Sequence, residues 1–146
     1  MARSDSLWLD SDIILDWLAA RQPWDAAATE IIERALGGEW VIWFSPLTLA
    51  NVYYLYRKHA GATAATAAIQ TLSQIGLIAT MDFRHVIQAI ANGHSDFEDE
   101  MQIACATAVP GLTAIITRNL SDYSHSPVAA MTARSWLEQH PDSSQE

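Results

Sequence analysis

The chain has 146 residues, 50% hydrophobic and 17% charged, so we expect one folded domain rather than a disordered chain. Seventeen Asp and Glu against eight Lys and Arg give a formal net charge of -9, which excludes a broad basic surface for polyanions. No apolar run is long enough for a membrane span, the first residues do not read as a secretory signal, and the single Cys105 excludes an internal disulfide, so we expect a cytoplasmic protein.

Hydrophobic periodicity divides the chain into alternating strands and helices. In chain order it predicts a strand at 7–9, helices over 11–20 and 25–36, a strand at 40–44, helices over 45–59 and 63–75, a strand at 77–81, helices over 83–91 and 96–109, strands at 112–116 and 128–131, and a last helix after residue 132. The expected helix caps are Ser11 or Asp12, Asp82, Ser95 or Asp96, and Thr132. Residues 92–94 are expected to form a turn and residues 120–127 a polar loop.

This alternation predicts an α/β fold, because strands that alternate with helices form parallel sheets with helices on both faces. We expect a three-layer α/β/α sandwich with a mostly parallel, Rossmann-like sheet of about four or five strands. One domain should span residues 6–140, and residues 141–146 should form a loose tail.

Polar residues follow several of the predicted strands, and sites in open parallel sheets form at the carboxyl ends of strands. Asp10 ends the first strand, Asn119 and Asp122 follow the strand at 112–116, and Asn51 lies in the helix after the second strand. Asp96, Asp99 and Glu100 lie in the first turns of a helix. If these segments converge, several carboxylates meet in one cleft and repel one another unless a cation joins them. Oxygen ligands with room for water select Mg²⁺ or Mn²⁺.

Each acid also has a structural interpretation. Asp10 and Asp96 could be helix caps, and Asp99 and Glu100 could be solvated first-turn acids that the helix dipole favours. Asp12 could be a capping residue, and Asp16 could be a surface acid.

Four segments decide between these interpretations, because they occur in the order typical of one family. They are Leu9-Asp10-Ser11-Asp12 with Ile13-Ile14-Leu15-Asp16, Ser45-Pro46-Leu47-Thr48-Leu49-Ala50-Asn51, Phe97-Glu98-Asp99-Glu100, and Ile116-Thr117-Arg118-Asn119-Leu120-Ser121-Asp122-Tyr123. Together they resemble the PIN-domain family over nearly the whole chain, and they look like a bacterial branch with Phe-Glu-Asp and Thr-Arg-Asn patterns.

The resemblance implies metal-dependent cleavage of single-stranded RNA, and a role as the toxin of a toxin–antitoxin pair of the VapC type. It makes Asp10 and Asp99 the first metal-binding carboxylates, with Asp122 and also Asp96 completing the cluster. It places Asn51, Asn119, Thr117, Arg118 and Asp12 around them, with Arg118 able to meet a phosphate. An antitoxin protein and a homodimer are the partners that it implies.

The chain departs from the family pattern at two positions. Asn51 stands where the second motif usually has Glu, and Asn119 stands where the closing motif often has Asp. Asn is a neutral ligand and cannot act as a base, so the usual set of four acids is reduced. Asp122 could compensate for Asn119, and Asp12 is one acid more than the pattern requires.

Two other functions stay open from the sequence. The run Asp10-Ser11-Asp12 also resembles the nucleophile motif of haloacid-dehalogenase-type phosphatases, but those enzymes need a later Lys, and the only one here is Lys58. The chain could also be a degenerate PIN module that binds RNA or a protein without cutting.

The aromatic residues and the cysteine carry smaller expectations. Trp8, Trp17 and Trp43 should lie in the core, whereas Trp24 and Trp40 could lie at a subunit contact. Cys105 should be a small buried group.

Overall fold

The computed structural model describes residues 4–93 and 96–142, and within them strands and helices alternate as predicted. The strands are β1 (Asp5–Leu9), β2 (Trp40–Phe44), β3 (Leu77–Ile78), β4 (Ala114–Ile116) and β5 (Ala130–Met131). The helices are α1 (Ser11–Leu18), α2 (Asp25–Leu36), α3 (Pro46–Ala60), α4 (Ala62–Ile75), α5 (Phe83–Asn92), α6 (Phe97–Thr107) and α7 (Ala133–Gln139), with a short 3-10 helix η1 (Leu120–Tyr123).

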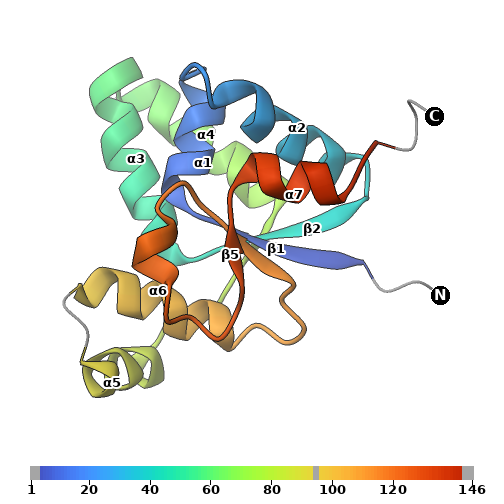
Figure 1. Cartoon of the computed structure of the whole chain (residues 1–146). Helices are drawn as coiled ribbons and strands as arrows, with labels where there is room; N and C mark the ends of the chain where they lie inside the picture. Colours follow the sequence, from blue (N-terminus) through green and yellow to red (C-terminus); the bar gives the residue numbers. More distant parts are fainter. Residues whose placement is uncertain (1–3, 94–95, 143–146) are drawn as a thin grey trace.

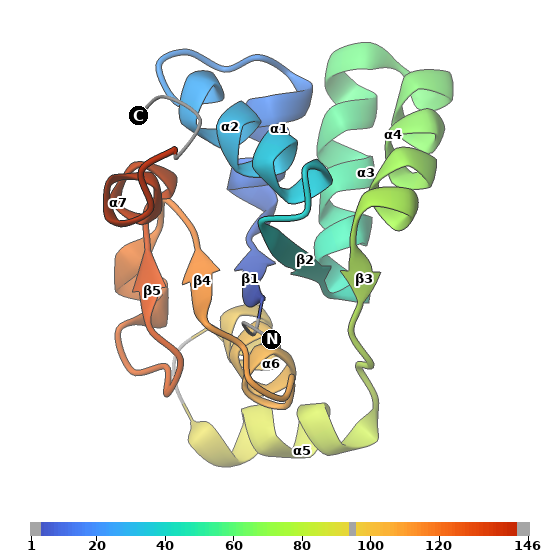
Figure 2. The same cartoon turned by 90° about the vertical axis from the view of Figure 1, so that its right-hand side faces the viewer.

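The strands form one sheet in the order β3-β2-β1-β4-β5, and every neighbouring pair is parallel. Helices α1 to α4 and α7 cover one face of this sheet, and α5 and α6 cover the other (Figure 1). Figure 2 shows the strands side by side between these two layers. The predicted three-layer α/β fold with a parallel sheet of about five strands is confirmed.

The core has two parts because successive side chains of a strand point to opposite faces of the sheet. Leu7 and Leu9 of β1 pack with α1, α2 and α3 in the larger cluster, and Trp8 packs with Ile103 and Cys105 of α6 in the smaller one. The residues that form these two clusters are almost fully buried. The sheet is therefore a rigid platform, and its carboxyl edge holds the segments that follow β1 and β4.

The strand order places a topological switch point at that edge. The chain runs outward from β1 to β2 and β3, then returns to the other side of β1 to form β4 and β5. In such sheets a crevice opens between the loops that leave the two central strands in opposite directions. Here those loops begin at Asp10 and Thr117.

Several predicted boundaries and roles are wrong. Asp10, and not Ser11 or Asp12, caps α1, because its side chain accepts the Ser11 N–H. The strands β3, β4 and β5 are shorter than predicted, and η1 lies within the predicted polar loop.

Further corrections concern burial. Asp16 is fully buried and not a surface acid, and Trp40 is only 4% exposed, which places it in the core and not at a subunit contact. Trp8 is fully buried as predicted, while Trp17 and Trp43 pack against the core only in part. The predicted turn residue His94, the alternative cap Ser95 and residues 143–146 of the predicted tail lie outside the described residues.

The described helices are all too short or too polar to cross a membrane.

Candidate functional site

The site is built on the register between β1 and β4. Leu9 pairs with Ile116, and the next amide, Asp10 N–H, donates to the Ile116 carbonyl at 3.0 Å. Asp10 and Thr117 therefore leave the sheet side by side. The Thr117 hydroxyl donates to Asp10 Oδ2 at 2.8 Å, and the Ser11 N–H donates to Asp10 Oδ1 at 2.8 Å. Asp10 is thus both a helix cap and a carboxylate fixed at the switch point.

Helix α6 and η1 bring further acids to this edge. Asp96 caps α6 by accepting the Asp99 N–H at 3.1 Å, and Asp99 stands half-buried one turn into the helix. Burial, and then the negative charges of Asp122, Asp96, Asp10 and Glu98, raise the pKa of Asp99 to about 7. Charges that shift a pKa in this way lie in the same part of the molecule, so Asp10, Asp96, Asp99 and Asp122 are neighbours at this edge of the sheet.

Tyr123 lies behind this cluster, and the sequence reasoning did not single it out. It is 3% exposed and lies close enough to Asp10 and Asp99 for their charges to act on its hydroxyl. Burial and the charges of Asp10 and Asp99 raise the pKa of Tyr123 far above its ordinary value. Tyr123 therefore stays protonated and adds no further negative charge beside Asp10. The aromatic residue that follows the acid in the closing motif was the available signal.

Asp12 lies next to Asp10 on the first turn of α1. Its Oδ2 accepts the Arg118 N–H at 2.9 Å and the Asn119 side-chain amide at 3.3 Å. Burial and the charge of Asp10 raise the pKa of Asp12 to about 6, against the opposing effect of Arg118. Its Oδ1 is buried without a hydrogen-bond partner among the described residues. Asn119, which the resemblance places around the metal ligands, donates to Asp12.

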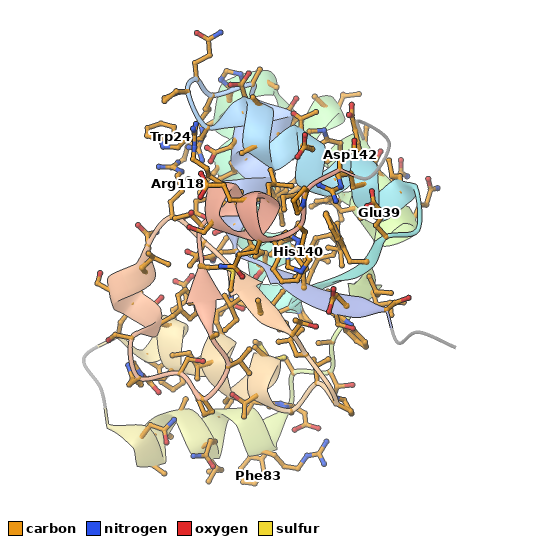
Figure 3. The ribbon with its side chains drawn as sticks, turned by 45° about the vertical axis from the view of Figure 1, so that its right-hand side comes forward. Trp24, Glu39, Phe83, Arg118, His140 and Asp142 are labelled. Carbon is orange, nitrogen blue, oxygen red and sulfur yellow. The ribbon has the colours of Figure 1, made fainter. Side chains whose placement is uncertain are left out.

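The side chain of Arg118 is turned away from the carboxylates. Its guanidinium holds buried Asp16 with two hydrogen bonds of 2.9 and 3.0 Å, and Arg21 binds the same carboxylate at 2.9 Å. The Arg118 guanidinium also lies 3.9 Å from the ring centre of Trp24, and Figure 3 shows these two side chains beside one another at the edge of the molecule. Arg118 therefore fixes the loop after β4 to α1.

Asn51 reaches the site through a contact between α3 and α6. Its amide donates to Glu98, a residue that the sequence reasoning did not select as a site residue. One turn away, Gln102 is buried and hydrogen-bonded to Ser45 and Thr48, which locks the start of α3 against α6. A carboxylate thus lies beside position 51 although the residue at 51 is neutral.

The donor set fits a loosely held Mg²⁺ or Mn²⁺. Asp10, Asp99 and Asp122 offer hard oxygen atoms, and their mutual repulsion is the condition that a cation relieves. In the described part of the chain no three His, Cys, Asp or Glu side chains close around a common point. Mg²⁺ does not need such a cage, because it keeps several waters and takes one or two protein carboxylates together with substrate phosphates.

A hollow of about 780 Å³ lies elsewhere, between α5 and α6. Cys105 lines it, and burial raises the pKa of the Cys105 thiol to about 11, which excludes a resting thiolate. The residue is the small buried group that the sequence predicts.

The raised pKa of Asp99 predicts that Asp99→Asn makes the metal-free protein more stable. The folded state binds the proton of the Asp99 carboxyl more tightly than the unfolded state does. The ionised carboxylate therefore destabilises the fold by an amount that grows from about pH 4 to pH 7 and stays constant at higher pH. Because Asp99 is only half-buried, solvent screening reduces the gain to about 1 kcal/mol, or about 3 °C in Tm, at pH 8. Thermal unfolding with chelator at pH 8 and pH 4.5 measures it, and Glu33→Gln on α2 is the control. If the Tm of Asp99→Asn at pH 8 were equal to or below that of wild type, the Asp99 charge would not destabilise the fold, and the prediction would be wrong.

The sequence matches a known protein family over most of its length. A family model described as "PIN domain" matches residues 6–121. No protein among those with curated functions matches the sequence.

Solved structures resemble the fold over most of the chain. The VapC20 toxin of Mycobacterium tuberculosis, described as cleaving the sarcin-ricin loop, has 17% identity and a TM-score of 0.65, covering 84% of this chain and 96% of that one. VapBC2 of Rickettsia felis, solved with a promoter DNA fragment, has 13% identity and a TM-score of 0.65, covering 87% and 98%. A toxin–antitoxin complex from Klebsiella pneumoniae has 19% identity and a TM-score of 0.64, covering 87% and 97%. At these identities the likeness shows a shared fold.

Proposed function

The chain belongs to the PIN-domain family, and from this premise we propose that it is a divalent-metal-dependent endoribonuclease that cuts single-stranded RNA. The observation that carries the proposal is that Asp99 is influenced by the charges of Asp122 and Asp10 near the switch point: burial, and then these charges, raise the pKa of Asp99 to about 7. Neighbouring carboxylates that destabilise the fold in this way are typical of sites that bind a metal ion together with a phosphate.

Each residue has a proposed role. Asp10 and Asp99 hold Mg²⁺ or Mn²⁺, and Asp122, with Asp96 beside it, binds the ion or orients its waters. The ion supplies an activated water and offsets negative charge on the phosphate under attack. Thr117 keeps the Asp10 carboxylate oriented by donating to it, and the buried Tyr123 stands beside it as a neutral wall of the site. Asp12 and Asn119 fix the loop after β4 at the rim of the site.

The structural relatives support a role as the toxin of a toxin–antitoxin pair, because several were solved with their antitoxin or are described as such complexes. We propose an antitoxin protein as a partner, a homodimer as the assembled state, and the cytoplasm as the location. The exposed Phe83, Ile87 and Ile90 on α5 are apolar side chains available for a protein contact.

One observation favours a second candidate, a PIN module that binds RNA or a partner without cutting. Positions 51 and 119 are Asn, and the described acids do not enclose an ion by themselves. The phosphatase hypothesis has no such support, because Lys58 lies in the last turn of α3, whereas Asp10 lies at the carboxyl edge of the sheet where α3 begins.

Cleavage of labelled single-stranded RNA by purified protein tests the proposal. We expect cutting with Mn²⁺ or Mg²⁺ and its loss with chelator, restored when excess metal is added back. The Asp10→Asn/Asp99→Asn double variant, purified in the same way, controls for contaminating ribonuclease. Equal cutting by wild type and double variant would refute the nuclease assignment. Metal binding without cutting would favour the binding module.

A further inference from the structure

The few cationic side chains of this acidic protein are mostly held by its own carboxylates. Arg34 is bound to Glu39, Arg84 to Asp82, and Arg21 and Arg118 share Asp16. Within residues 4–93 and 96–142, only Arg57, Lys58 and Arg134 have no ion pair. Any local attraction for a polyanion must therefore come from a small number of places.

One such place is a pocket of about 480 Å³ beside the carboxylate site. It lies between the start of α2 and the start of α7, and its lining includes Pro23, Trp24, Arg118, Thr132, Arg134 and the buried Asp16. Its volume falls within the range of about 300–1,000 Å³ that is usual for small-ligand sites. Apolar residues of α1, α2 and α7 complete its walls: Ile13, Ala27 and Ala133.

The charge of this pocket is opposite to that of the whole chain. Asp16 carries one negative charge but contacts two guanidinium groups, those of Arg21 and Arg118. The lining of the pocket itself carries two guanidinium groups, those of Arg118 and the exposed Arg134, against the one carboxylate of Asp16. In a chain of formal net charge -9, this is a local site for an anion.

Trp24 gives the pocket an aromatic surface. It is 45% exposed, which is unusual for so large a side chain, and Arg118 holds its ring from one side at 3.9 Å from the ring centre. A Trp that is fixed in place and still exposed can stack a nucleobase, since every base has a flat π-face.

The pocket is joined directly to the carboxylate site. Thr117, which donates to Asp10, is the neighbour of Arg118, and consecutive Cα atoms lie about 3.8 Å apart. The Arg118 N–H also donates to Asp12 at 2.9 Å. The pocket and the carboxylate site are therefore neighbours on the loop that follows β4.

We propose that this pocket is a nucleotide subsite of the RNA strand, in which a base next to the cut phosphate stacks on Trp24 and its phosphate meets Arg134. The inference rests on the proposed function for the identity of the strand. It explains how an acidic protein binds RNA without a broad basic surface: one anion site and one stacking site stand next to the carboxylates. Cutting is expected to prefer the base that this pocket accepts.

Binding is measured separately from cutting, in an Asp99→Asn background that holds RNA without cleaving it. Short oligoribonucleotides carry 2-aminopurine at successive positions, and stacking on an indole quenches its fluorescence. We expect quenching at one position, lost in Trp24→Ala together with about tenfold weaker binding. Arg134→Gln should weaken binding several-fold and lower the salt dependence by about one phosphate contact. Tyr54→Ala and Arg57→Gln are matched controls, because they remove an exposed aromatic and an unpaired Arg on α3, outside the pocket.

The outcomes separate the subsite from the proposed activity. Position-specific quenching that depends on Trp24 supports the subsite even if wild type cuts no RNA. Equal effects of the Trp24 and Tyr54 variants, or RNA binding too weak to measure at low salt, overturn it. Quenching of free 2-aminopurine riboside as strong as that of the oligomer would indicate a free-nucleotide pocket and overturn the strand assignment. A change of oligomeric state in Trp24→Ala, with RNA binding unchanged, would make the Trp a subunit contact and also overturn it.

Discussion

Asp10→Asn is expected to lower RNA cleavage by about a thousandfold or more without loss of the fold. Asn caps a helix as well as Asp does, and it has the same shape, so the Ser11 N–H keeps its acceptor. The substitution removes the negative charge that a divalent ion needs as a ligand. Metal ligands and groups that stabilise charge in the transition state contribute effects of this size. Single-turnover cleavage rates at saturating Mn²⁺ measure it.

Asp82→Asn is the matched control for this variant. Asp82 also caps a helix, α5, but its carboxylate is bound to Arg84 and takes no part in the cluster at the switch point. Cleavage by Asp82→Asn should stay within about twofold of wild type. If Asp10→Asn also retained near wild-type cleavage, the Asp10 carboxylate would be only a cap, and the assignment of the metal ligands would be wrong.

The fold was predictable because its signals are local and mutually consistent. The run Trp40–Phe44 is aromatic and β-branched, Ser45 and Pro46 begin the helix that follows, and the parallel order follows from the alternation of strands and helices. The shortness of β3, β4 and β5 was not predictable, because strand length depends on which backbone groups find partners across the sheet.

The candidate site was predictable where a residue follows a central strand. Asp10 and Thr117 meet because their strands are neighbours, and the ends of parallel strands lie at one edge of the sheet. The role of Asp16 was not predictable, because its two partners are 5 and 102 residues away in sequence. The burial of Trp40 was not predictable for the same reason. Trp40 packs against Trp136 and donates to the Ile31 carbonyl, and no local sequence pattern connects these residues to it.

Asp16→Ala is expected to lower the free energy of unfolding by about 3 kcal/mol. The carboxylate is fully buried and is the shared partner of Arg21 and Arg118, so its removal leaves two guanidinium groups without their acceptor. Breaking a buried ion pair from one side costs about 3–5 kcal/mol. The lower value applies because Arg21 and Arg118 are 40% and 27% exposed and can reach water. Urea unfolding at pH 7 measures the change.

Glu30→Ala separates this effect from that of an ordinary ion pair. Glu30 is 44% exposed and lies 3.6 Å from Arg34, so its loss should cost less than about 1 kcal/mol. A similar small loss for Asp16→Ala would mean that water replaces the carboxylate and that the triad does not hold the loop after β4. If the loss is large, the same variant should also weaken RNA binding, because Arg118 would no longer be held against Trp24 and Asp12. The buried acid would then be the residue through which the stability of α1 and the geometry of the site depend on each other.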